Sequence, residues 1–269
     1  MGAEKIGFIG CGSMGGAIAR AVCAAVGPQE VLLANRTPAK AEKLAAELGC
    51  ASGTNAQAAA CRWVFLAVKP QGMAELLAGL TPQLAARTDR FFLVSMAAGL
   101  SMAQIRRMAG CGCPVVRMMP NTPCAVGAGM IQYCTDGLSA AEADEFARML
   151  AKAGRVDALN EGLIDAASSV SGCGPAWAYQ FIEALADGGV ACGLPRAKAQ
   201  EYAAQMLLGS AALVLQGGSH PGVLKDAVCS PGGSTIQGVR VLEERGFRGA
   251  VMDAVIAACD KTKDMGKGK

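Results

Sequence analysis

The sequence contains one histidine, His220, and none of its 12 cysteines form a CxxC pair. Imidazoles and closely spaced thiolates are the usual ligands of bound zinc, so their scarcity predicts a protein without a metal site. The cysteines are instead scattered through segments with helical or strand periodicity, where they serve as small apolar residues. We therefore expect reduced thiols rather than disulfides, and a cytoplasmic location.

Long uncharged apolar runs are also missing. Hydrophobic residues make up 52% of the chain, but proline, glycine, serine or asparagine interrupts each long uncharged stretch, so we expect no membrane span. The chain enters a strand-like segment at once, which predicts that no signal peptide is present. The net charge is +3, and the only basic run, Lys261 to Lys269, is most simply a solvated tail. Nucleic acid is therefore not an expected partner.

A glycine-rich turn lies between the first strand-like segment and the first helical one. Gly10, Gly12 and Gly15 form a GxGxxG pattern there, and this setting makes the pattern strong evidence for dinucleotide binding. The first glycine permits the sharp turn, the second lets a pyrophosphate approach the backbone, and the third packs the helix closely against the strand. The predicted pyrophosphate-binding residues are Ile9, Gly10, Cys11, Gly12, Ser13, Met14 and Gly15.

Strand-like and helix-like segments alternate over the first half of the chain, which is the pattern of a parallel, doubly wound sheet. Together with the glycine turn, this predicts an α/β Rossmann domain over residues 1–158 and an all-α domain over residues 159–269, with the boundary near Asp157–Asn160. We expect no strand after about Ala140, and a kink or break where Gly172 to Pro175 interrupts a long helix. The expected strands span residues 5–9, 31–35, 63–68, 91–96, 115–118 and 129–134, and the expected helices span residues 14–26, 39–48, 73–84, 102–108, 140–153, 161–191, 196–215, 221–228, 234–245 and 248–264.

The end of the second expected strand indicates which dinucleotide binds. An NAD-specific site would carry an acidic residue there, whereas this chain has Asn35, Arg36 and Thr37. Arginine forms charge-assisted bonds to a 2′-phosphate that a carboxylate would repel, so we predict NADPH, with NADH as a weaker alternative. Asn35 and Thr37 are also suited to capping the helix expected from Pro38.

Further cofactor contacts are expected where other strands end, because open α/β sheets bind ligands at the carboxyl ends of their strands. Lys69 is placed to contact a ribose or phosphate, and Pro70 to start the next helix. The alternative is that Lys69 is simply a solvent-exposed lysine in a turn, without a ligand. The other predicted contacts are Asn55, Ala67, Val68, Ala97 and Ala98.

A second anion site is expected where the loop Ser230-Pro231-Gly232-Gly233 leads directly into the helical segment that begins Ser234-Thr235. Free backbone N–H groups at a helix start favour a small anion such as a carboxylate. The alternative is an ordinary capped turn between two helices.

Five segments carry a resemblance that covers essentially the whole chain. They are Gly7-Phe8-Ile9-Gly10-x-Gly12-x-Met14-Gly15, Ala67-Val68-Lys69-Pro70, Met119-Pro120-Asn121-Thr122-Pro123, Ser171 to Trp177, and His220-Pro221 through Ser230-Pro231-Gly232-Gly233-Ser234-Thr235. In this order they resemble the pyrroline-5-carboxylate reductase family. The resemblance implies NAD(P)H-dependent reduction of the imine carboxylate 1-pyrroline-5-carboxylate to L-proline, the last step of proline biosynthesis. It also implies a helical dimerisation domain, and a homodimer or higher oligomer of dimers whose active site both subunits complete.

The same resemblance implies roles for individual residues. The substrate carboxylate would rest on backbone donors around Gly233, and the Thr235 hydroxyl would lie near the ring nitrogen as the catalytic group. Glu161 would face the substrate, although an acid in a first helical turn after Asn160 is an equal explanation. The implied substrate-binding residues are Glu161, Ser230, Gly233, Ser234 and Thr235.

The sequence departs from the family pattern at three positions. Cys173 stands where serine is usual, Trp177 where tyrosine is usual, and Ala227 where a polar residue is common. A thiol is a weaker hydrogen-bond donor than a hydroxyl, so a role for the usual serine hydroxyl does not carry over to Cys173.

The scarcity of histidine agrees with an imine substrate. Reducing a ketone creates an alkoxide that needs a positioned acid, whereas a protonated C=N bond already carries the charge that accepts hydride. His220, next to Pro221, has no orienting partner evident in the sequence. We therefore assign His220 to capping rather than to proton transfer.

Three alternatives share parts of this pattern. A β-hydroxyacid dehydrogenase has the same glycine opening but uses a lysine on the long central helix, and no lysine lies between Pro175 and Gly193. A reductase of another cyclic imine and a non-enzymatic NADP sensor are the other two.

Apolar residues along two helical segments favour a homodimer over an unusually broad internal core. These residues are Ala203, Leu207, Ala211, Leu213, Leu215, Val251, Val255 and Ile256.

Overall fold

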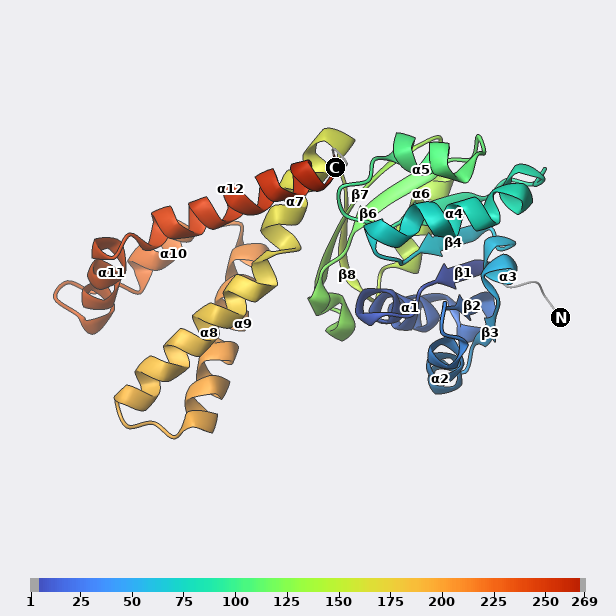
Figure 1. The fold of residues 1–269 in the computed structure, drawn as a ribbon. Helices are drawn as coiled ribbons and strands as arrows, with labels where there is room; N and C mark the ends of the chain where they lie inside the picture. Colours follow the sequence, from blue (N-terminus) through green and yellow to red (C-terminus); the bar gives the residue numbers. More distant parts are fainter. Residues whose placement is uncertain (1–4, 267–269) are drawn as a thin grey trace. The chain divides into compact units, whose positions relative to one another are not determined.

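The computed structural model describes residues 5–266 of the 269-residue chain (Figure 1). The chain divides into two compact units, of which one is Gly174–Ala257 and the other is formed by the residues before and after it. The end of the expected basic tail, residues 267–269, lies outside the described residues. Within residues 5–266, no helix combines the length and apolar character needed to cross a membrane.

An eight-stranded sheet forms the centre of the first unit, in the order β3-β2-β1-β4-β5-β6-β7-β8. Neighbouring strands are parallel except for β6 and β7, which are antiparallel. The strand order reverses between β1 and β4, which is the point where doubly wound sheets bind their ligands. The strands are β1 (Ile6–Ile9), β2 (Val31–Ala34), β3 (Ala51–Gly53), β4 (Trp63–Leu66), β5 (Phe92–Ser95), β6 (Val115–Met119), β7 (Gly129–Asp136) and β8 (Gly154–Ala158).

Helices cover both faces of this sheet (Figure 1). Successive strand residues alternate between the two faces: Phe8 packs in a cluster with residues of α1, α2 and α6, whereas Ile9 packs in a cluster with residues of α3, α4, α5 and α7. Both side chains are buried, and each such burial stabilises the fold by about 1.5–3 kcal/mol. The helices and 3-10 turns are α1 (Ser13–Val26), η1 (Pro28–Glu30), α2 (Pro38–Leu48), α3 (Asn55–Ala59), α4 (Pro70–Ala85), α5 (Met102–Ala109), η2 (Thr122–Val126), α6 (Ala140–Met149) and α7 (Glu161–Ser171).

From α7 to residue 266, the regular secondary structure consists of helices only. In the second unit, Gly189 lets α8 and α9 pack closely, since a Cβ on it would lie 3.2 Å from that of Ala199. The rings of Phe181 on α8 and Phe247 on α12 lie 5.9 Å apart between centroids. The helices are α8 (Gly174–Ala191), α9 (Arg196–Gly217), α10 (Pro221–Ala227), α11 (Ser234–Glu244) and α12 (Phe247–Gly266).

The predicted fold class is confirmed: a mostly parallel Rossmann-type sheet precedes a helical region. The expected interruption of the long helix is also present, because α7 ends at Ser171 and α8 begins at Gly174. The first compact unit includes α7, because Ile164 of this helix is buried in a hydrophobic cluster with residues of the sheet. The boundary expected near Asp157–Asn160 follows the end of the last strand, β8.

The expectation of no strand after Ala140 is wrong. β8 pairs in parallel with β7. The sequence does not indicate this strand, because Arg155 is exposed and its neighbours are half exposed, so the segment has no continuous apolar run. β3 at the other edge of the sheet was missed for the same reason. The helix expected over residues 140–153 ends at Met149, and Gly154 has a φ of 141°, which suits the turn into β8.

Candidate functional site

The glycine turn after β1 is tightly packed on one side and open on the other. Gly10 has a φ of 113°, and a Cβ on it would lie 2.5 Å from the Ala67 carbonyl oxygen. A Cβ on Gly15 would lie 2.2 Å from the Gly10 carbonyl oxygen, so α1 closes directly onto the turn. At Gly12, by contrast, a Cβ would meet no atom of the described residues within 4 Å. The three glycines therefore have the conformations that their predicted roles require.

The start of α1 is suited to a pyrophosphate. Gly12 is the N-cap residue and offers no side chain to occupy the first backbone N–H groups of the helix. The first turn carries no acidic residue, so nothing in it opposes an anion. Unpaired N–H groups and the helix dipole both favour negative charge at this position. The residues present therefore fit a dinucleotide phosphate group.

Asn35, at the end of β2, is engaged by the protein itself. Its Oδ1 accepts the Cys11 backbone N–H at 3.0 Å, and its Nδ2 donates to the Thr37 carbonyl oxygen at 3.0 Å. Thr37 occupies the N-cap position of α2, but within residues 5–266 its side chain accepts no capping hydrogen bond. Arg36 is exposed beside it. Asn35 thus fixes the glycine turn against the end of β2, and Arg36 beside it is an exposed positive charge.

The other predicted cofactor residues lie where neighbouring strands end. The Ala67 N–H donates to the Ile9 carbonyl oxygen at 2.9 Å, so the turn after β4 lies beside the end of β1. Val68 is half-buried, and Lys69 is the exposed N-cap residue of α4, with Pro70 at the first helical position as expected. Ala97 is buried and Ala98 half-buried after β5, and Asn55 begins α3 after β3. The sheet therefore brings the ends of β1, β2, β4 and β5 to one edge.

Glu161 has structural partners. Its Oε1 accepts the Met102 backbone N–H at 2.7 Å, at the start of α5, and lies 3.9 Å from the guanidinium of Arg117. The Arg117 side chain is only 4% exposed and forms an ion pair with Asp165. These contacts tie α7 to α5 and to β6. A role for Glu161 toward substrate stays a prediction.

Sequence reasoning missed Arg117. Its Nε is buried and has no hydrogen-bond partner among the described residues. The available signal was a single charge within the apolar strand Val115–Met119. A buried cation needs a paired acid, so this signal indicated acidic residues nearby, although the sequence does not identify them.

The loop before α11 leads directly into the helix, and the role of this helix start as a substrate site stays a prediction. The Gly233 N–H bonds to the Ser230 carbonyl oxygen at 3.0 Å, and Gly233 is the N-cap residue of α11. Gly232 has a φ of 71°, a conformation that favours glycine. Ser234 and Thr235 follow on the first turn, and both are exposed. The helix start is therefore open to a carboxylate.

The single histidine is a capping residue, as expected. His220 is the N-cap of α10, and its Nδ1 accepts the Gly222 backbone N–H at 3.0 Å. The nitrogen that could accept a proton is therefore already engaged by a backbone N–H of the same helix. The His, Cys, Asp and Glu side chains described between residues 5 and 266 form no group of three able to hold a metal ion.

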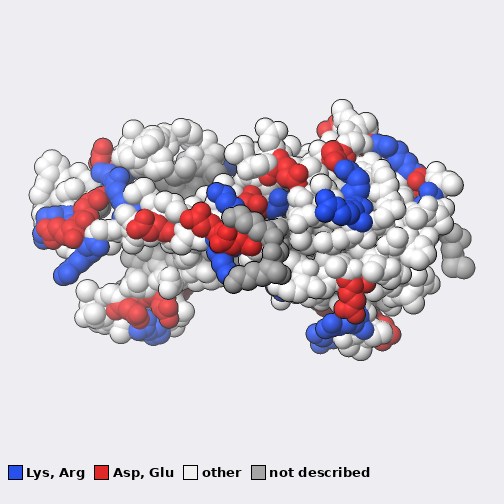
Figure 2. All heavy atoms as spheres, turned by 45° about the horizontal axis from the view of Figure 1, so that its top comes forward, with Lys and Arg blue, Asp and Glu red and all other residues white. Residues whose placement is uncertain are grey.

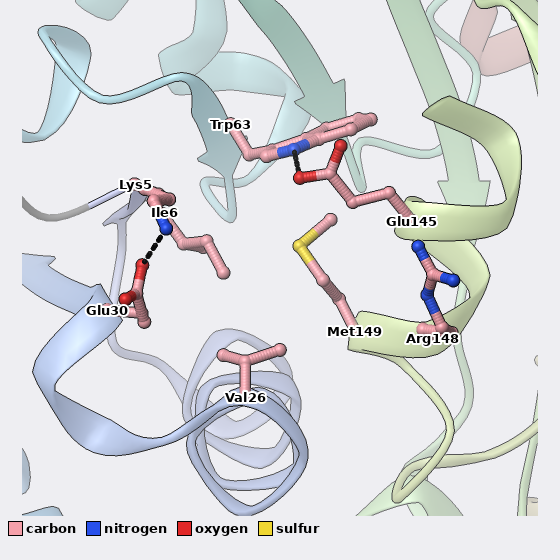
Figure 3. A pocket seen from close by; sticks show the side chains of 8 residues that line it. All are labelled: Lys5, Ile6, Val26, Glu30, Trp63, Glu145, Arg148 and Met149. Carbon is pink, nitrogen blue, oxygen red and sulfur yellow. Dashed lines mark hydrogen bonds and ion pairs between the residues drawn. The ribbon is translucent and has the colours of Figure 1, made fainter. Parts of the chain in front are cut away.

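A cavity of about 270 Å³ lies at the amino ends of β1 and β4 (Figure 3). Lys5 Nζ pairs there with Glu30 at 3.2 Å, and Trp63 Nε1 donates to Glu145 at 3.2 Å. Parallel strands place their amino ends opposite their carboxyl ends, so this cavity is separate from the dinucleotide turn. It is lined by Lys5, Ile6, Val26, Glu30, Trp63, Glu145, Arg148 and Met149.

Two family models match the chain. The model described as pyrroline-5-carboxylate reductase dimerisation matches residues 161–265, and the model described as NADP oxidoreductase coenzyme F420-dependent matches residues 5–99. The first match begins with α7 and covers the helical region. The second covers β1 to β5, including the glycine turn.

Relatives match over nearly the full length. Pyrroline-5-carboxylate reductase of Escherichia coli is 40% identical, with 98% of this chain and 99% of the relative covered. Pyrroline-5-carboxylate reductase 3 of Xenopus laevis is 38% identical, with 97% and 96% covered. The crystal structure of Plasmodium falciparum pyrroline carboxylate reductase with NADP bound has a TM-score of 0.87 and 32% identity, with 99% of both chains covered. The chain thus belongs to the pyrroline-5-carboxylate reductase family.

Proposed function

We propose that this protein reduces the C=N bond of 1-pyrroline-5-carboxylate to give L-proline, using NADPH and the two binding regions described above. The reaction is that of its family and completes proline biosynthesis. The observation that carries it is the 40% identity to a reductase of this substrate over 98% of the chain. The open helix start at α11 and the open glycine turn at Gly12 supply the two anion sites that the reaction needs.

The first unit binds the nucleotide in this proposal. When bound, NADPH supplies the hydride that reduces the imine carbon. The N–H groups at the start of α1 bind the pyrophosphate, and Arg36 binds the 2′-phosphate. Asn35 holds the glycine turn in the conformation that leaves those N–H groups open. The NADP bound by the Plasmodium falciparum relative supports this assignment.

The start of α11 binds the substrate. The helix start that follows Gly233 holds the carboxylate through the N–H groups of Ser234 and Thr235, together with Ser230, and thereby orients the ring. The Thr235 hydroxyl orients the ring nitrogen, because its oxygen accepts the N–H of the protonated imine. Because a protonated imine already carries positive charge, no histidine acid is required, which agrees with the use of His220 as a cap.

The Thr235 assignment is tested by replacing this residue with alanine. Thr235→Ala removes the hydroxyl but keeps the backbone donors, so kcat with 1-pyrroline-5-carboxylate should fall by about 10²-fold while the KM for NADPH stays within about twofold. Thr235→Ser is the matched control, because it retains the hydroxyl and should retain most of the turnover. An alanine variant with unimpaired kcat would remove Thr235 from the catalytic step.

The sequence and the structure also bear on the cellular location, the partners and the oligomeric state of the enzyme. We infer a cytoplasmic location, supported by 12 cysteines that are scattered along the sequence without CxxC spacing. We infer that nucleic acid is not a partner, supported by the mixture of acidic and basic side chains on the face shown in Figure 2. The dimerisation family model supports a homo-oligomer. We propose a homodimer or an assembly of dimers, with residues 159–269 as the substrate-binding and dimerisation domain.

A further inference from the structure

Two cysteines lie together in the loop that joins α5 to β6. The Sγ atoms of Cys111 and Cys113 are 2.8 Å apart. Cys111 is half-buried, whereas Cys113 is 8% exposed. A disulfide bond is about 2.05 Å long, so the sulfur atoms need to approach by only about 0.8 Å to bond. The pair therefore has one accessible thiol and one shielded thiol within immediate reach of each other.

The backbone of this loop accommodates such a movement. Gly110 ends α5 with a φ of 64°, and Gly112 stands between the two cysteines. A Cβ on Gly112 would meet nothing within 4 Å in the described part of the chain, so the space beside it is open. A glycine between two thiols gives the loop the conformational freedom that closing a short ring requires.

The charges around the pair favour a thiolate at the accessible position. The Arg106 Nε donates to the Cys113 carbonyl oxygen at 3.4 Å, and Arg106 is held by an ion pair with Asp136. A hydrogen bond from Cys113, together with the positive charges of Arg106 and Arg87, holds the pKa of the Cys111 thiol below its usual value. The same hydrogen bond and burial raise the pKa of the Cys113 thiol. Cys111 is therefore the nucleophile of the pair, because the thiolate is the reactive form.

We propose that Cys111 and Cys113 form a reversible thiol–disulfide site that is oxidised by small disulfides of the glutathione class. The Cys111 thiolate attacks one sulfur of the disulfide, which forms a mixed disulfide and releases one thiolate. Cys113 then loses its proton, attacks the Cys111 sulfur and expels the second thiolate. The small disulfide is reduced to two thiols, and the two cysteine thiols are oxidised to one internal disulfide.

This site is separate from imine reduction. The loop precedes Val115, the first residue of β6, so it lies at the amino end of that strand. β6 is parallel to β5 and so to the strands whose carboxyl ends carry the nucleotide-binding residues. The cysteine pair thus lies at the opposite edge of the sheet from those residues, and its oxidation is expected to leave turnover unchanged.

The test uses the native full-length protein and glutathione disulfide. After incubation, free thiols are alkylated with iodoacetamide and the protein is digested with trypsin. Residues 108–117 form one tryptic peptide that contains both cysteines and no other. In the wild type this peptide should lose both alkylation sites and become two hydrogen atoms lighter than the dithiol. Treatment with dithiothreitol before alkylation should restore both sites.

Two conservative variants separate the steps. Cys113→Ser should accumulate a glutathione adduct on Cys111, because the resolving thiol is missing. Cys111→Ser should leave Cys113 unmodified, because the remaining thiol is shielded. The proposal is overturned if Cys111 and Cys113 stay alkylatable while the exposed Cys192 is thiolated. Turnover of treated wild type should equal that of treated Cys111→Ser, and a lower value for wild type would contradict the separation from imine reduction.

Discussion

At the scale of the residue, Arg36 is the side chain that we propose reads the 2′-phosphate of the nucleotide. It is exposed at the end of β2, and the neighbouring Asn35 is held by hydrogen bonds within the protein. A charge-assisted hydrogen bond contributes about 1.5–3 kcal/mol, so Arg36→Ala should raise the KM for NADPH by roughly 10- to 100-fold. The KM for NADH, which lacks the 2′-phosphate, should change by less than about twofold.

A matched control for Arg36 is available on α2. Lys43→Ala removes another exposed positive charge, in the second turn of the helix, and it should leave the NADPH to NADH preference unchanged. Initial rates with both nucleotides provide the comparison. Equal changes in the two KM values of Arg36→Ala would show that Arg36 does not read the 2′-phosphate.

Individual residues differ in how far the sequence predicts them. The roles of Gly10 and Gly15 follow from local geometry, because only glycine fits a turn whose backbone lies so close to its neighbours. The partners of Glu161 do not follow, because Met102 and Arg117 are distant in the sequence and meet only in the folded sheet. Short-range patterns therefore predicted the nucleotide turn but not the polar contacts behind it.

At the scale of the element, burial decides which segments the sequence predicts. The central strands are buried on both faces and appear as continuous apolar runs such as Trp63–Leu66. The edge strands β3 and β8 carry exposed or polar residues, so periodicity does not separate them from loops. Likewise, the start of α3 at Asn55 depends on a capping box between Thr54 and Gln57 that lies outside any apolar pattern.

The start of α6 contains an acid-sensitive contact. Glu142 accepts the Ser139 backbone N–H at 2.8 Å and two hydrogen bonds from Arg90, at 2.6 and 2.8 Å. The Arg90 guanidinium, followed by the Ser139 N–H, lowers the pKa of Glu142 to about 2. Its value in the unfolded chain is about 4.3. This contact therefore stabilises the fold fully above about pH 4.3, and the stabilisation is lost as the pH falls toward 2.

Glu142→Gln tests this contact. Glutamine keeps the capping box but removes the charge, so the variant should have a lower Tm than wild type at pH 7, and the difference should shrink as the pH falls below about 4.3. High salt should also reduce the difference, because Arg90 is half exposed. Glu42→Gln removes an exposed acid from α2 as a control. A Tm difference that is independent of pH would contradict the role of the Glu142 charge.

At the scale of the whole molecule, the helical region requires a second copy of the chain. Tyr202, Met206 and Leu213 repeat along one face of α9 and are 55%, 46% and 62% exposed. Leu208 and Leu215 lie on another face and are also exposed. Large apolar side chains exposed on two faces of one helix are normally covered by a partner, and the dimerisation family model covers this region. The amino-acid composition predicted this association, because apolar surface of this extent is not stable in water.

Charged substitutions on α9 should therefore separate the subunits. The double variant Met206→Glu and Leu213→Glu places two carboxylates in an interface that would have to desolvate them, so sedimentation should show a shift from oligomer to monomer at micromolar concentration. Gln205→Glu adds a charge to the same helix without removing an apolar side chain, and it should remain oligomeric. Circular dichroism should show that the double variant keeps its helix content, so that a monomer reflects lost association rather than unfolding. A double variant that sediments like wild type would place the interface on other surfaces of the chain.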